Sequence, residues 1–154
     1  MNKLDELEMK IKELSEEIER LKEEKENEAW KPKGGDKYWT ISHTGYVVQV
    51  RWMGDESEDD IYAIGNVFHT KEEAEFRVEQ IKVEAELRRF IGPYDKNKIN
   101  FMLTYNHIRD EILIDYCQYT HCTNINFASE EIAQKAIDAV GADRIKKYYF
   151  GVEE

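Results

Sequence analysis

Cysteine, proline and long apolar runs are scarce in this sequence. The 154 residues include two cysteines and two prolines. Two cysteines cannot build a disulfide framework, so Cys117 and Cys122 are expected to be buried thiols in a reducing compartment. No apolar run approaches the roughly 20 residues that span a membrane, and the polar, charged N-terminus does not resemble a signal peptide. The composition therefore predicts a cytoplasmic protein that has no membrane partner.

Clusters of positive charge are also missing. The chain has 33 acidic side chains against 22 Lys and Arg, which gives a formal net charge of −11. Surfaces that bind nucleic acid carry a basic patch, so direct binding of DNA or RNA is not expected. The expected loop at residues 54–60, GDESEDD, is acidic enough to imitate nucleic-acid phosphates toward a protein partner. The alternative is that this charge only keeps the protein soluble.

Recognisable catalytic and cofactor motifs are absent as well. The chain has no phosphate-binding glycine loop, and none of its four histidines lies in a nucleophile, zincin or deaminase motif. Cys117, His121 and Cys122 come nearest to a metal-binding set. A zinc site needs four ligands, and no second pair at a helpful spacing is present. The sequence predicts a protein that is not an enzyme, with no metal and no cofactor.

Residues 1–29 contain neither glycine nor proline and repeat apolar residues at alternating steps of three and four. This spacing is typical of a coiled-coil seam. The seam residues are Leu4, Leu7, Ile11, Leu14, Ile18 and Leu21. Isoleucine at the a positions and leucine at the d positions favours a parallel pair of helices, and so a homodimer or a larger homo-oligomer. The alternative is an amphipathic helix packed against its own domain.

Two similar units are expected after this helix, at residues 30–92 and 93–154. Runs of β-branched and aromatic residues separated by turn residues predict the strands, and capping residues predict the helices. In the first unit we expect strands at 38–41, 46–52 and 61–64 and a helix at 71–91. In the second we expect strands at 99–105, 111–116 and 118–127, a helix at 130–140 and a last element at 144–150.

One corner of the chain occurs in both units. The stretch GNVFHTKEEAEF at 65–76 returns as INFASEEIAQKA at 125–136, an offset of 59 residues. Thr70 and Ser129 occupy the helix N-cap in each copy, and Glu73 completes a capping box with Thr70. Each corner is expected to attach a helix to a small antiparallel sheet. The predicted fold is α+β: an N-terminal coiled-coil helix, then two small antiparallel-sheet-plus-helix units that share a core.

The first corner, GNVFHTKEEAE, together with WKPK at 30–33 and YWTI at 38–41, resembles small accessory proteins encoded by bacteriophages and prophages. In the second unit Phe127, Ser129, Ala133 and Gly141 belong to the same pattern. The resemblance implies a phage accessory protein that acts in the cytoplasm of the infected host. Small acidic proteins of this kind are often anti-defence factors, which block a CRISPR effector or sequester a nucleotide immune signal.

Aromatic residues gather around the first hairpin, and basic residues lie beside them. Bases stack on aromatic rings, and phosphates bind Arg, Lys and the N–H groups at helix starts. These residues predict a small nucleotide-type ligand. The resemblance to phage accessory proteins implies that this ligand is an immune signal, a cyclic nucleotide or a cyclic ADP-ribose, which is sequestered without catalysis. The expected ligand-binding residues are Trp30, Lys31, Trp39, Arg51, Tyr62, Asn66 and Thr70. One alternative is an acidic inhibitor of a host defence effector that targets nucleic acid, and another is a purely structural oligomer.

Overall fold

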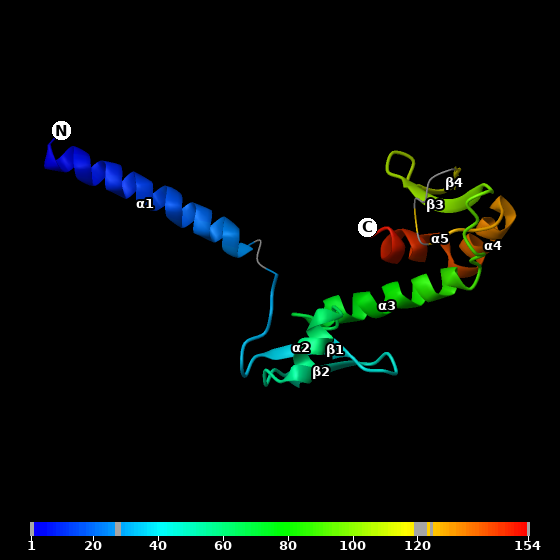
Figure 1. Cartoon of the computed structure of the whole chain (residues 1–154), viewed down its shortest axis with the longest axis horizontal. Coiled ribbons are helices and arrows are strands. Elements are labelled where there is room, and N and C mark those ends of the chain that lie inside the picture. Colours follow the sequence, from blue (N-terminus) through cyan, green and yellow to red (C-terminus); the bar gives the residue numbers. More distant parts are fainter. Residues whose placement is uncertain (1, 27–28, 119–122, 124, 154) are drawn as a thin grey trace.

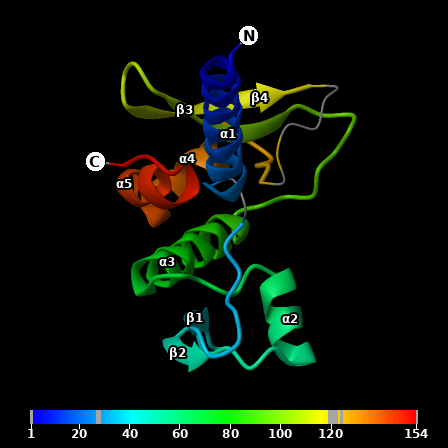
Figure 2. The same cartoon turned by 90° about the vertical axis from the view of Figure 1, so that its left-hand side faces the viewer.

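The computed structural model describes residues 2–26, 29–118, 123 and 125–153, and it has the expected α+β architecture (Figure 1). The chain begins with helix α1 (Lys3–Glu26), which stands apart from the rest of the protein in Figure 1. Two antiparallel hairpins and their helices form the remaining body. Figures 1 and 2 show the two hairpins on opposite sides of helix α3 (Lys71–Arg88).

The first unit is built on the hairpin of β1 (Lys37–Ile41) and β2 (Val47–Arg51). The corner at 65–70 joins this hairpin, because Trp39 and Phe68 exchange two backbone hydrogen bonds of 2.9 and 2.8 Å. Thr70 then caps α3 with the expected capping box. The corner therefore fixes the start of α3 against the first strand, as the sequence predicts.

Residues 54–64 differ from the prediction. The expected loop at 54–60 and strand at 61–64 are wrong, because Glu56–Ala63 form helix α2. The Asp55 carboxylate accepts a hydrogen bond from the Glu58 N–H at 2.9 Å, and the Glu58 carboxylate accepts one from the Asp55 N–H at 3.2 Å. The buried Glu58 side chain also accepts from the N–H of Met53 at 2.8 Å. This capping box starts a helix where local composition predicts a loop.

The second unit repeats the construction with β3 (Asn100–Asn106) and β4 (Glu111–Cys117). Phe101 and Phe127 exchange backbone hydrogen bonds of 3.0 and 2.7 Å, and Ser129 caps helix α4 (Glu130–Val140). The strand expected at 118–127 is reduced, within the described residues, to the single bridge at Phe127. Residues 119–122 and 124 of that expectation lie outside the described part of the chain.

The C-terminal segment forms the short helix α5 (Ala142–Arg144) and the π-helix η1 (Ile145–Tyr149), which confirms the expected last element. Helix α3 is the element that the two units share. Its first turn buries Ala74 near the first hairpin, where Tyr38 of β1 and Trp52, just after β2, are also buried. Its second half contributes to the main core. The buried residues of this main core are Val83, Leu87, Leu103, Ile125, Phe127, Ala133, Ala136, Ile137, Val140 and Ile145.

Candidate functional site

A group of aromatic and charged side chains surrounds Lys31 in the first unit. The Lys31 ammonium lies 5.5 Å from the centroid of the Trp52 ring and 5.0 Å from that of Tyr62. A cation at this distance from an aromatic face is held by the quadrupole of the ring. Trp52 follows β2 and Tyr62 belongs to α2, so the sheet and the helix together position the cation. We call Lys31, Trp52 and Tyr62, together with the chain neighbour Trp30 and its stacking partner His69, the aromatic–lysine cluster.

Asp59 of α2 is the anionic neighbour of this cluster. Its Oδ1 lies 2.8 Å from the Lys31 Nζ, and the two side chains are 58% and 46% exposed. An ion pair this exposed contributes little to stability, and an ammonium has three donors. Lys31 therefore has donors left for a second acceptor, although part of its charge is already neutralised by Asp59.

Trp30 provides the flat face of the cluster. Its ring stacks on the ring of His69, with centroids 4.6 Å apart and planes 20° from parallel. The Trp30 side chain is 36% exposed, whereas Trp52 is 4% exposed and belongs to the core. A stacked but accessible indole is a surface on which a planar ring can stack. Sequence reasoning named Trp30, Lys31 and Tyr62 for this place and missed His69 and Asp59.

Two other predicted ligand-binding residues use their polar groups inside the fold. The Asn66 side chain accepts a hydrogen bond from the Ile41 N–H and donates one to the Ile41 carbonyl, both at 2.8 Å. The Thr70 hydroxyl accepts from the Glu73 N–H at 3.2 Å, while the Glu73 carboxylate accepts from the Thr70 N–H at 3.1 Å. Asn66 and Thr70 therefore position the corner, and Glu73 places negative charge at the helix start where a phosphate would have to bind.

Trp39 and Arg51 lie on the first hairpin. Trp39 is half-buried, and its backbone is paired with Phe68. Arg51 is exposed and donates a hydrogen bond of 3.3 Å to the Gly35 carbonyl. The contacts that the structure gives these two residues are thus with the hairpin and the corner. Of the predicted residues, Lys31 and Tyr62 have side chains that lie together, and Trp30 is adjacent to Lys31 in the chain.

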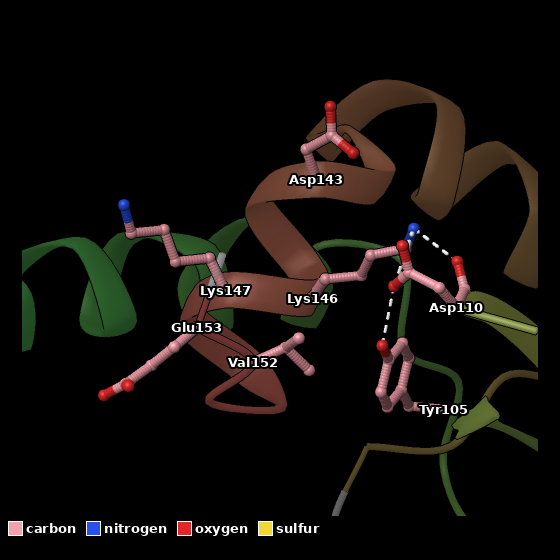
Figure 3. A pocket seen from close by; sticks show the side chains of 7 residues that line it. All are labelled: Tyr105, Asp110, Asp143, Lys146, Lys147, Val152 and Glu153. Carbon is pink, nitrogen blue, oxygen red and sulfur yellow. Dashed lines mark hydrogen bonds and ion pairs between the residues drawn. The ribbon is translucent and has the colours of Figure 1, made fainter. Parts of the chain in front are cut away.

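A second candidate is a hollow of about 450 Å³ beside the C-terminus, which we call the C-terminal hollow (Figure 3). The Tyr105 hydroxyl donates to Asp110 Oδ1 at 2.6 Å, and Lys146 Nζ donates to the Asp110 carbonyl oxygen at 2.6 Å. Lys146 Nζ also lies 3.4 Å from Asp110 Oδ1. The lining residues are Tyr105, Asp110, Asp143, Lys146, Lys147, Val152 and Glu153.

Three polar groups of this hollow, those of Tyr105, Asp110 and Lys146, bond to one another. The hydrogen bond to Asp110 raises the pKa of Tyr105, and the same hydrogen bond, followed by those with Lys146, lowers the pKa of Asp110. Tyr105 therefore stays protonated and Asp110 stays ionised at neutral pH. Thirty-six residues separate Asp110 from Lys146, so no local spacing in the sequence indicates this network.

The cysteines differ from expectation. Cys117 is 4% exposed and is disulfide-bonded, so the prediction of an ordinary buried thiol is wrong for this residue. Its sulfur also lies 3.6 Å from the Met102 sulfur. His121 and Cys122 lie outside the described residues. Across the described ranges, no three His, Cys, Asp or Glu side chains are arranged to hold a metal ion.

Comparison with known proteins found no match to this chain. No protein-family model matches the chain, and neither the curated proteins nor the solved structures contain a match. The resemblance to phage accessory proteins therefore remains a prediction from the sequence. None of the helices in the described part of the chain is both long enough and apolar enough to cross a membrane.

Proposed function

We propose that the protein sequesters a small nucleotide-derived signal of the cyclic nucleotide or cyclic ADP-ribose type, without catalysis. The observation that carries this proposal is the aromatic–lysine cluster, in which an accessible indole lies next to a cation in the chain. A nucleotide presents the matching pair of groups, a flat base and a phosphate. The five side chains come from the segment before β1, the end of β2, helix α2 and the corner before α3, so the folded first unit holds them in place.

Each group has a separate role in this proposal. The exposed face of Trp30, whose ring is already stacked on His69, receives the base. Lys31, held between Trp52 and Tyr62, binds the phosphate, and this contact replaces part of its ion pair with Asp59. This exchange costs little, because the Lys31–Asp59 pair is exposed on both sides.

The biological setting is proposed from the resemblance of the sequence. A phage accessory protein that removes a nucleotide signal from the host cytoplasm would prevent activation of the defence effector that the signal controls. The protein would bind the signal and leave it chemically intact. Sequestration needs affinity and abundance, and it needs no acid, base or nucleophile in the site.

The proposal is tested by calorimetric titration of the full chain with a panel of cyclic dinucleotides, cyclic trinucleotides and cyclic ADP-ribose isomers. Mass spectrometry of each ligand after binding completes the test. Saturable heat with the ligand recovered unchanged supports sequestration. Recovery of a cleaved ligand would show that the protein is an enzyme and would overturn the proposal. Absence of binding heat with every member of the panel would refute nucleotide sequestration.

Helix α2 supports a second candidate, an acidic inhibitor of a nucleic-acid-targeting defence effector. Glu56 and Asp60 lie one turn apart on this capped helix, and both are exposed. A fixed pair of carboxylates can imitate phosphates toward a basic groove. The test is competition with DNA for a purified CRISPR effector. Inhibition by the wild-type chain that is lost in the double variant Glu56→Gln, Asp60→Asn would support this function in place of sequestration.

A further inference from the structure

Helix α1 exposes an apolar seam from Leu4 to Leu21, along most of its length. Its six seam residues are between 50% and 64% exposed, although leucine and isoleucine side chains are normally buried. At about 1.5 Å per residue, the 24 residues of α1 form a rod of roughly 36 Å. A helix of this length gains most of its stability in proteins from packing of its apolar face, so an unpacked α1 lacks the interaction that its sequence is built for.

The body of the same chain does not cover this seam. Every described side chain from Asn2 to Glu24 is exposed, and Figure 1 shows α1 pointing away from both hairpins. This arrangement excludes, for the described structure, the alternative of an amphipathic helix packed on its own domain. The described body of this chain therefore supplies no partner for the seam.

We propose that this partner is α1 of a second copy of the chain, and that the two helices form a parallel two-stranded coiled coil. The seam is complementary to itself, because Ile11 and Ile18 occupy successive a positions and Leu7 and Leu14 successive d positions. This distribution is the one that favours two parallel strands. A second copy also supplies a seam of the same length, so each seam residue of one helix has a counterpart in the other.

The charges beside the seam fit the same partner. In a parallel pair each g residue faces the e residue five positions on in the other helix. Lys3 then faces Glu8, and Glu17 faces Lys22, so both contacts join opposite charges. The third contact, of Lys10 with Ser15, is neutral. The ion pair of Lys12 with Glu16, at 4.0 Å within one helix, lies on the side away from the seam and is not disturbed by dimerisation.

The proposal does not rest on the ligand proposed above, because α1 contributes no residue to the aromatic–lysine cluster. It has one consequence for that cluster. Parallel helices place both bodies at the C-terminal end of the coil, so each dimer carries two copies of the cluster. The two proposals can therefore fail separately. A protein that binds no nucleotide could still be a dimer, and a monomeric protein could still bind a nucleotide at its cluster.

The first test is the mass of the full-length protein in solution, measured by sedimentation equilibrium over a range of concentrations. The wild-type chain is expected to be dimeric at high concentration. Leu14→Asp places a charge in the middle of the seam in both helices, and it should weaken dimerisation by at least about a hundredfold. Glu16→Asp introduces the same side chain on the opposite side of α1 and should leave the dimer unchanged.

Because α1 does not pack on the body, tryptophan fluorescence of the Leu14→Asp variant should still report a folded body. A monomeric or trimeric wild-type chain would overturn the proposal, and so would a Leu14→Asp variant that remains a dimer.

The second test addresses orientation. Glu17→Lys places two lysines opposite each other in a parallel dimer and should weaken it several-fold. The further change Lys22→Glu restores opposite charges and should recover the wild-type affinity. In an antiparallel pair residues 17 and 22 do not face each other, so a double variant as weak as Glu17→Lys alone would refute the parallel arrangement.

Discussion

Arg144 joins two helices that are far apart in the sequence, and its replacement gives a quantitative test of how the body is held together. Its guanidinium contacts the Glu86 carboxylate of α3 through two hydrogen bonds of 2.8 and 3.0 Å. It also donates to the Val140 carbonyl at the end of α4, at 3.2 Å. One side chain therefore ties the start of the C-terminal segment to α3 and α4.

The size of the effect follows from the geometry. Hydrogen bonds to charged groups contribute about 1.5–3 kcal/mol when they are well shielded, whereas exposed ion pairs contribute about 0–1 kcal/mol. The Arg144 and Glu86 side chains are 37% and 29% exposed, so this pair lies between the two cases. Arg144→Met keeps much of the aliphatic stem and removes the guanidinium. We expect it to lower the free energy of unfolding by about 1–2 kcal/mol at neutral pH.

The pair also predicts a pH dependence. Hydrogen bonding to Arg144 lowers the pKa of Glu86 below its ordinary value of 4.5. A lowered pKa in the folded state means that this stability is fully present above pH 4.5 and is lost as the pH falls through the lowered pKa. The difference in the free energy of unfolding between wild type and Arg144→Met should therefore become smaller at acid pH.

The assay is urea unfolding followed by circular dichroism at pH 7 and at pH 3. Arg88→Met is the matched control, because Arg88 bonds Glu84 at 2.9 Å within one helix and both side chains are more exposed. Such a pair contributes about 0.2–0.5 kcal/mol. Equal losses in the two variants, or a loss in Arg144→Met that does not change with pH, would refute the reasoning.

Three further predictions concern the corner, the core and the C-terminal hollow. Thr70→Ala removes the acceptor for the Glu73 N–H and should cost about 1 kcal/mol in urea unfolding, and an unchanged midpoint would exclude a capping role. Leu87→Ala empties a fully buried position of the main core and should cost about 2–5 kcal/mol in the same assay, so a loss below that range would contradict the packing described. In ultraviolet titration Tyr105 should ionise above its ordinary pKa of 10.0. The stabilisation from its raised pKa is present below pH 10.0 and lost above it, and Asp110→Asn should return the pKa toward the ordinary value.

Much of the fold could be predicted from local chemistry. The helix expected at 130–140 has those bounds in the structure, because an N-cap serine and a terminal glycine mark both ends. Both hairpins and both corners were also predictable from strand residues, turn residues and caps. Helix α2 was missed because acidic composition outweighed the Asp55 and Glu58 pair, although this pair has the same three-residue spacing as the capping box of Thr70 and Glu73.

The candidate site could be predicted only in part. Trp30 and Lys31 are neighbours in the chain, so the sequence itself shows that they are adjacent. The contact of Tyr62 with Lys31 could not be predicted, because it depends on residues 56–63 forming helix α2. Asp59 comes to Lys31 through the same helix. The sequence could not show whether Asn66 binds a ligand or supports the fold. Its side-chain amide pairs with the Ile41 backbone in the structure, and nothing in the sequence distinguishes such an amide from one that binds a ligand.

The most direct test of the account is a matched pair of titrations with whichever cyclic nucleotide binds the wild-type chain. Lys31→Met removes the cation of the aromatic–lysine cluster, and Lys33→Met makes the same change at an exposed lysine two residues away. The account predicts that Lys31→Met raises the dissociation constant at least about tenfold, as expected for the loss of one charge-assisted contact, while Lys33→Met leaves it unchanged. Equal affinity of the two variants for the ligand would contradict the claim that this cluster is the binding site.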